Sequence, residues 1–195
     1  MPRPLSPSGP RARRGFALAE VAVSLAIFAV SASILAQTYR AGHALRVQAH
    51  EEGLATTAAQ NVLERMRGAR FGELVARFDP DPFNDPLGPG TAHGATFDVP
   101  GLQPSEDDDD GAVGEVVLPV VDMGDAIAAD FQVREDSGPA ELGLPRDLNG
   151  DAVVDDGDHS DDAILVPALV RVRWQSNRGP RELEFFTAFT EYIKE

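Results

Sequence analysis

The densest group of candidate ligand atoms in this 195-residue chain is the segment DLNGDAVVDDGD, residues 147–158. Oxygen atoms at positions 1, 3, 5, 7, 9 and 12 of a twelve-residue loop can surround a calcium ion, with position 7 contributing its backbone carbonyl. Those positions hold Asp147, Asn149, Asp151, Val153, Asp155 and Asp158. The spacing predicts a structural Ca²⁺ site, and the alternative is a solvated turn in an Asp-rich region.

The sixth position of this loop departs from the calcium-binding pattern. A glycine normally makes the sharp turn there, whereas this chain has Ala152. The segment otherwise resembles dockerin-type calcium loops, which end on aspartate, and Val154 takes the place of their hydrophobic residue. His159, Asp161 and Asp162 follow directly as further candidate ligands. No clear helix flanks the loop, which favours an ion that orders a connection between strands.

Catalytic chemistry has little support in the sequence. Paired carboxylates are abundant, so an anchored hydrolase is one alternative. The histidines, however, have no metal-ligand spacing such as HExxH, and no GxSxG nucleophile motif occurs. The absence of cysteine removes disulfides, thiolate ligands and cysteine nucleophiles. We therefore expect a protein that is not an enzyme.

Residues 1–15 contain four basic and no acidic residues, whereas the rest of the chain has a large excess of acidic ones. Without residues 1–15 the chain keeps 13 of its 17 basic residues and all 32 acidic ones, a net charge of 13 − 32 = −19. Contact with phosphates needs clustered Lys and Arg. We therefore expect no nucleic-acid partner, and cations are a more natural one.

Residues 16–36, FALAEVAVSLAIFAVSASILA, are apolar except for Glu20. Their length matches the ~20 residues that cross a bilayer core, and the preceding arginines favour a cytoplasmic N-terminus. A secretory signal peptide and a simple anchor are the alternatives. Glu20 argues against a signal peptide, because a carboxylate near the end of a spanning helix costs on the order of 2–3 kcal/mol on insertion scales.

The run RRGFALAEVAVSLAIFAV resembles the class III signal of type IV prepilins and type II secretion pseudopilins. The resemblance implies that a prepilin peptidase cuts between Gly15 and Phe16 and commonly methylates the new amine. It also implies that Glu20 pairs with the Phe16 amine of a neighbouring pilin or pseudopilin subunit and so sets the axial stagger. Ala17 is a minor departure, since the family often has Thr or Ser there.

The apolar pattern continues beyond the membrane segment. No proline occurs from residue 37 to 70, and Leu54, Ala58, Val62 and Met66 recur every fourth position. We expect one helix of about 55 residues, roughly 80 Å long. The run AAQNVLERMRG resembles the end of this helix in minor pilins of the PilV kind and pseudopilins of the GspI kind.

The remaining segments predict a β-rich head. Residues 79–90 are dense in Pro, Gly and Asp and predict a loop. Strands are expected at residues 95–99 and 116–121, where Pro119 favours an edge position. The run ILVPALVRVRWQ from Ile164 alternates as a half-buried antiparallel strand, SNRGP forms a turn, and RELEFFTAFTEYI returns as a second strand.

Together these elements predict an α+β fold of the pilin-like kind. Its expected parts are a cytoplasmic leader at 1–15, a transmembrane half-helix at 16–36, an amphipathic half-helix at 37–72 and an acidic head at 73–195. The resemblance implies a minor pilin or pseudopilin in the bacterial inner membrane. It would span the membrane once, with a periplasmic or extracytoplasmic head. A secreted or anchored calcium-dependent binding module is the alternative.

Overall fold

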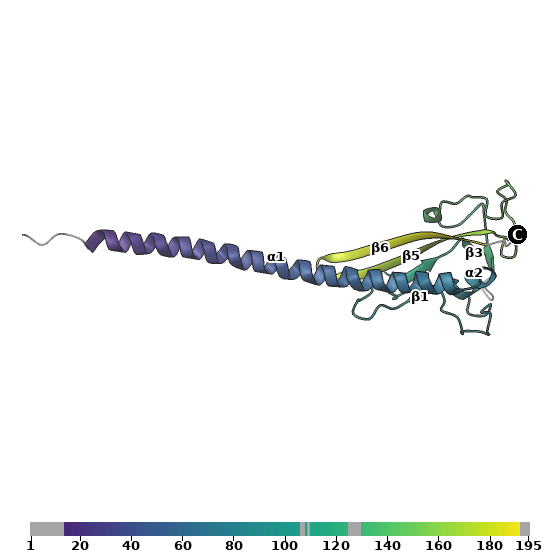
Figure 1. Ribbon diagram of the computed structural model, residues 1–195, viewed down its shortest axis with the longest axis horizontal. Helices are drawn as coiled ribbons and strands as arrows, with labels where there is room; N and C mark the ends of the chain where they lie inside the picture. Colours follow the sequence, from purple (N-terminus) through teal and green to yellow (C-terminus); the bar gives the residue numbers. More distant parts are fainter. Residues whose placement is uncertain (1–13, 106–107, 109, 125–129, 192–195) are drawn as a thin grey trace, which may run out of the picture. The chain divides into compact units, whose positions relative to one another are not determined.

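The structure, a computed structural model, describes residues 14–105, 108, 110–124 and 130–191 (Figure 1). The chain divides into two compact units, Met1–Val47 and Gln48–Glu195. Helix α1 (Arg14–Gly68) has 55 residues and belongs to both units. The prediction of one long helix is therefore confirmed.

Helix α1 contains no proline, and some of its hydroxyl side chains bond to the helix's own backbone. Ser31 and Thr38 each donate their hydroxyl to the carbonyl four residues earlier, at 2.8 and 2.9 Å. Arg65 and Arg67 lie in the last turn, where positive charge complements the helix dipole. After Gly68 the chain turns into two short helices, η1 (Phe71–Glu73) and α2 (Leu74–Phe78).

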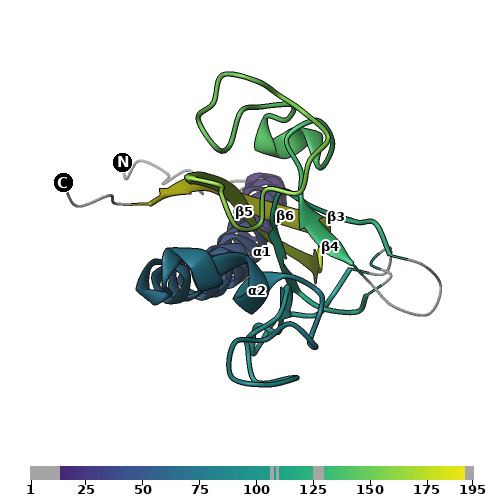
Figure 2. The ribbon, with the colours of Figure 1, turned by 90° about the vertical axis from the view of Figure 1, so that its right-hand side faces the viewer.

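The strands of the second unit form two antiparallel sheets. The larger sheet has the order β1-β2-β5-β6, and the smaller consists of β3 and β4 (Figure 2). The bounds are β1 Thr96–Phe97, β2 Gly114–Val117, β3 Val120–Asp122, β4 Phe131–Val133, β5 Leu165–Ser176 and β6 Gly179–Thr190. The β5–β6 hairpin, in which all 12 residues of each strand pair, is the predicted C-terminal hairpin.

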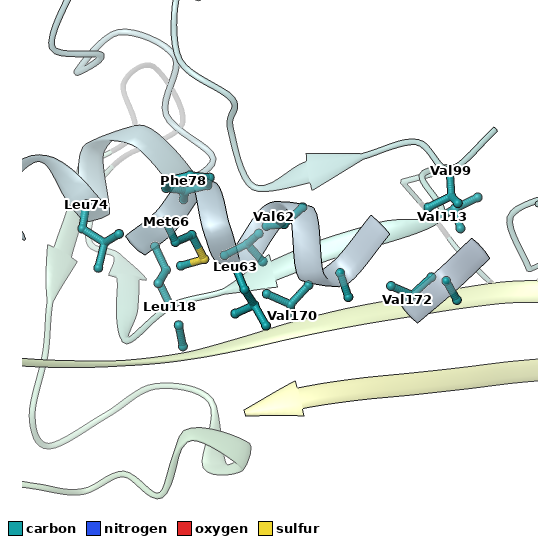
Figure 3. Packing of buried hydrophobic residues seen from close by; sticks show 14 of the residues in the cluster. Val62, Leu63, Met66, Leu74, Phe78, Val99, Val113, Leu118, Val170 and Val172 are labelled. Carbon is teal, nitrogen blue, oxygen red and sulfur yellow. The ribbon is translucent and has the colours of Figure 1, made fainter. Parts of the chain in front are cut away.

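The core lies between the last third of α1 and the larger sheet (Figure 3). Of the predicted stripe, Val62 and Met66 are at most 2% exposed, whereas Leu54 and Ala58 are only partly buried. The neighbouring Ala55 and Ala59 are fully buried and complete the helix side of the core. The sheet contributes Val116, Val170, Val172 and Trp174. Polar contacts tie the hairpin to the same helix: the Trp174 indole donates to Glu51 at 3.3 Å, and Arg181 donates to Glu52 at 2.9 Å.

The predicted strand at residues 116–121 is two strands in different sheets. Pro119 lies between β2 and β3, outside both ladders, so its lack of an N–H removes no ladder hydrogen bond. The edge prediction is wrong for β2, which lies between β1 and β5. Strand β4 was not expected from the sequence, because three residues are too few to establish an alternating pattern.

Strand β5 is half-buried only in its second half. From Val170 to Gln175 the valines and Trp174 are buried, whereas the intervening polar side chains are more exposed. In the first half, Val166 to Val170 are all buried. The segment that includes η2 (Ala140–Leu142) contacts β5 and covers the face opposite α1 (Figure 2). The head thus has a second layer that the alternation did not predict.

A buried carboxyl group holds this second layer together. Glu135, just after β4, is 0% exposed, and its Oε1 accepts the backbone N–H groups of Leu148 at 2.5 Å and Asn149 at 3.1 Å. The Glu135 carbonyl also accepts the N–H of Arg146 at 2.9 Å, and the His159 N–H donates to the Val133 carbonyl at 2.9 Å. Both ends of the acidic loop are therefore fixed to the end of β4.

We expect Glu135→Ala to lower the free energy of unfolding of the head by about 1–3 kcal/mol, because two N–H groups lose their acceptor. Glu135→Gln keeps an acceptor oxygen and should lose less. Denaturant titration of the full chain in detergent, followed through the buried Trp174, measures both, since the chain has a single tryptophan. An alanine variant as stable as wild type would show that Glu135 does not hold the loop.

Candidate functional site

The described part of the first unit has an unburied apolar surface. Along residues 18–45 of α1 the large apolar side chains are exposed, among them Leu18 at 78%, Phe28 at 72% and Leu35 at 71%. An 18-residue window of this helix has a mean hydropathy of 2.2, and none of it is buried. Such a surface is stable in lipid or against other apolar helices. The helix fits a membrane-anchored protein.

Glu20 is the one ionisable residue between Phe16 and Tyr39. It lies in a shallow depression with Val23 and Ser24, which are one helical turn further along. Within the described residues no basic side chain forms an ion pair with it. A carboxyl group in an apolar segment is costly without a partner, and the pairing of Glu20 stays a prediction.

The predicted processing site lies at the start of α1. The Gly15–Phe16 peptide bond falls in the first turn of the helical backbone, whereas the predicted leader, apart from Arg14 and Gly15, lies outside the described residues. Cleavage at this bond would leave Glu20 at the fifth position from the new amine. The assembly role of Gly15, Phe16 and Glu20 stays a prediction.

The acidic loop is exposed, and its predicted ligands bind their own backbone. Asp147 accepts the N–H groups of Gly150 at 2.6 Å and Ala152 at 2.8 Å, and these bonds lower the pKa of Asp147. Asn149 and Asp151 each accept the N–H two residues further on, at 3.0 and 2.7 Å. Asp155 and Asp158 do the same, at 2.7 and 3.0 Å.

The backbone of this loop makes the turn that the calcium pattern requires. Ala152, at the sixth position, has a φ of 68°, in the left-handed region that glycine usually occupies. The expected hydrophobic anchor is absent, however, since Val154 is 45% exposed. In the described part of the chain no three acidic or histidine side chains are grouped so that they could hold a metal ion. The calcium site stays a prediction.

Next to the loop, a histidine is enclosed by carboxyl groups. His159 is 5% exposed, and its Nε2 lies 3.1 Å from Asp155 and 3.8 Å from Glu135. Its Nδ1 lies 3.1 Å from Asp162. Burial alone would lower the pKa of His159, but the hydrogen bonds to Asp162 and Asp155 and the charge of Glu135 together raise it. This arrangement stabilises the imidazolium form.

Sequence reasoning placed His159 and Asp162 beside the loop but missed Glu135. Glu135 lies 12 residues before Asp147 in an irregular segment, and no spacing rule connects it to the loop. Its Oε2 is buried and forms no hydrogen bond. Only the position of β4 against the loop brings these groups together.

Comparison with known proteins gives one match. Residues 10–36 match the family described as the prokaryotic N-terminal methylation motif. No curated protein and no solved structure matches the chain. The matched range includes the Gly15–Phe16 bond, Glu20 and the apolar segment to Ala36. The likeness to the PilV or the GspI kind stays a prediction. The chain therefore carries a type IV pilin-like prepilin signal on an α+β, pilin-like fold.

Proposed function

We propose that this chain is a structural subunit, a minor pilin or pseudopilin, of a type IV pilus or a type II secretion filament. The observation that carries the proposal is an unburied apolar helix segment that lies within a methylation motif and contains one carboxyl group. An anchor alone has no use for that carboxyl group. A helix that packs against copies of similar helices does.

The chemistry of assembly follows from the position of Glu20. Cleavage before Phe16 creates an amine, and an amine in an apolar environment needs an anionic partner as much as Glu20 needs a cation. Phe16 and Glu20 are four residues apart in the same helix, and the resemblance to prepilins implies that each group pairs with its counterpart on a neighbouring subunit. Each pairing then sets the axial offset between two protomers.

The surroundings of the helix support a topology for the subunit. Arginines directly precede the apolar segment, which favours a cytoplasmic N-terminus. The acidic head then lies in the periplasm or outside the cell, anchored in the inner membrane by a single span. The expected partners are a prepilin peptidase and other pilin or pseudopilin subunits. The irregular Pro- and Asp-rich loops favour a minor subunit.

An enzymatic role has less support. The sequence contains no HExxH or GxSxG motif, and both ring nitrogens of the buried His159 face carboxyl groups. A calcium-dependent binding module is a second candidate, because the backbone at Ala152 takes the conformation that a calcium loop needs at its sixth position. Calcium binding in the head is compatible with a filament subunit.

Processing gives the first test of the filament role. We expect the mature protein to begin at Phe16, having lost residues 1–15 and gained a methyl group on the new amine. Intact-mass measurement of the membrane fraction identifies both changes. Gly15→Leu should leave the chain uncut but still inserted. A mature N-terminus near Gln37 or Thr38 would instead identify a secretory signal peptide and end the pilin reading.

Glu20 gives the second test. Glu20→Ala should insert at least as well as wild type, because a costly carboxyl group is removed. Assembly should fall at least about a hundredfold, since breaking a buried ion pair costs about 3–5 kcal/mol. Co-purification of partner subunits measures this. Glu20→Gln should fail similarly, whereas Ser24→Ala, on the same helix face, should assemble normally. Unchanged assembly of Glu20→Gln would rule out an ionic pairing role.

Calcium gives the third test. At a hundredfold excess over Kd, an ion that binds only the folded head stabilises it by about 2.7 kcal/mol, which raises Tm by several degrees. We expect this shift for the full chain in detergent with millimolar calcium, a smaller one with magnesium, and none with chelator.

Two variants make the calcium test specific. Replacing Asp147 and Asp151 with Ala should abolish the shift. Ala152→Gly should increase it, because glycine adopts the left-handed turn without strain. If the wild-type protein shows no shift, or the double variant retains it, residues 147–158 form a solvated turn.

A further inference from the structure

Among the residues that the structure describes, β6 is the edge strand of the larger sheet, and one set of its backbone groups faces away from β5. It pairs with β5 along its whole length without a bulge. One bond gives the phase of the ladder: the N–H of Glu191 donates to the Ile164 carbonyl at 3.0 Å. Hydrogen-bonded and non-bonded pairs alternate in an antiparallel ladder. The residues whose N–H and C=O groups point away from β5 are therefore Glu182, Glu184, Phe186, Ala188 and Thr190.

Much of this edge lacks the features that usually block an edge strand. Proteins protect edges with lysine, proline, inward charges or bulges. Pro180 and the glutamates at 182 and 184 supply such features in the first half of β6. The second half, Phe185–Thr190, reads FFTAFT and has no charge, Pro or Gly. Such six-residue segments pair readily with other strands, and Phe186 is 56% exposed.

A groove lies beside the same edge. Its volume is about 430 Å³, and its lining combines one side of α1 with one residue of β6, namely Gln60, Asn61, Leu63, Glu64, Arg67 and Phe185. Leu183, Phe185 and Phe189 pack against the core but are only partly buried. Side chains of a strand added to β6 would point alternately to the two sides of the sheet. Those on the α1 side would enter the groove and cover these three residues.

Charge determines which partner fits. From Gln48 to Glu195 the chain has 11 basic and 31 acidic residues, a net charge of 11 − 31 = −20, so a second copy is repelled. Glu182 and Glu184 lie at outward-facing positions of the edge, where cross-strand neighbours of opposite charge are favoured. We propose that β6 accepts an extended, basic segment of another protein by strand addition.

The segment that fits has two kinds of side chain in alternation. Apolar side chains face the groove beside α1, and Lys or Arg side chains lie on the other face, beside Glu182 and Glu184. Main-chain hydrogen bonds to the outward groups of β6 supply affinity, and the groove and glutamates supply selectivity. The filament role is not needed for this inference, and the variants below leave the processing site untouched.

Ala188 allows a direct test of strand addition. Its N–H points away from β5, so Ala188→Pro removes a donor from the free edge and keeps the β5–β6 ladder. Ala188→Val fills a similar position but keeps the N–H. The probe is a labelled peptide of about ten alternating Val and Lys residues, titrated against the full chain in detergent. We expect Ala188→Pro to bind about tenfold more weakly than wild type, and Ala188→Val to bind like wild type.

A second measurement keeps the test decisive if Ala188→Pro fails to fold. The chain has no cysteine, so Thr190→Cys on the edge and Asp156→Cys in the acidic loop are matched single-cysteine variants. A Val–Lys peptide whose terminal cysteine carries a mixed disulfide should exchange with the Thr190→Cys thiol, releasing the small thiol, in several-fold excess over Asp156→Cys.

Four results would overturn the proposal. The first is equal binding by folded Ala188→Pro and wild type, and the second is equal cross-linking at the two cysteines. The third is binding of an alternating Val–Glu peptide as tight as that of Val–Lys, or no binding of either. The last is self-association of the wild-type chain that Ala188→Pro abolishes, which would make a second copy the occupant.

Discussion

The packing of one helical stripe against β5 is the contact on which the head depends. Ala55, Ala59, Val62 and Met66 bring small and flexible side chains to a strand whose Val170, Val172 and Trp174 face them. The alanines let helix and sheet approach closely, and the larger residues fill the space that remains. The same strand pairs with β2 and β6 and contacts the η2 segment of the second layer.

Acidic side chains outnumber basic ones in the head, and many of them are stabilised by nearby hydrogen bonds and shared ion pairs. Arg171 contacts Glu184 at 2.7 Å and Glu115 and Glu141 at 3.5 Å, so one cation serves three carboxylates. In the acidic loop, aspartates accept backbone N–H groups instead. These bonds favour the ionised forms, but they leave the repulsion between neighbouring charges in place. Cations and basic partners therefore have a physical reason to associate with this head.

Two surfaces of the described chain are suited to contact with other molecules: the apolar part of α1 and the outer edge of β6. The exposed apolar side chains of α1 are unfavourable in water, and lipid or other apolar helices would cover them. In the described part of the chain no strand pairs with the outer edge of β6, and only another strand can supply hydrogen-bond partners there in regular order.

The sequence by itself determined the features that depend on local spacing. The apolar length of residues 16–36, the position of Glu20, the stripe from Leu54 to Met66 and the final hairpin all follow from periodicity or turn chemistry, because neighbours in the chain are neighbours in space there. Tertiary structure alone decided the split at Pro119, the second layer over β5, the burial of Glu135 beneath the acidic loop and the free edge of β6. Each depends on which distant segments lie side by side, and no local pattern carries that information.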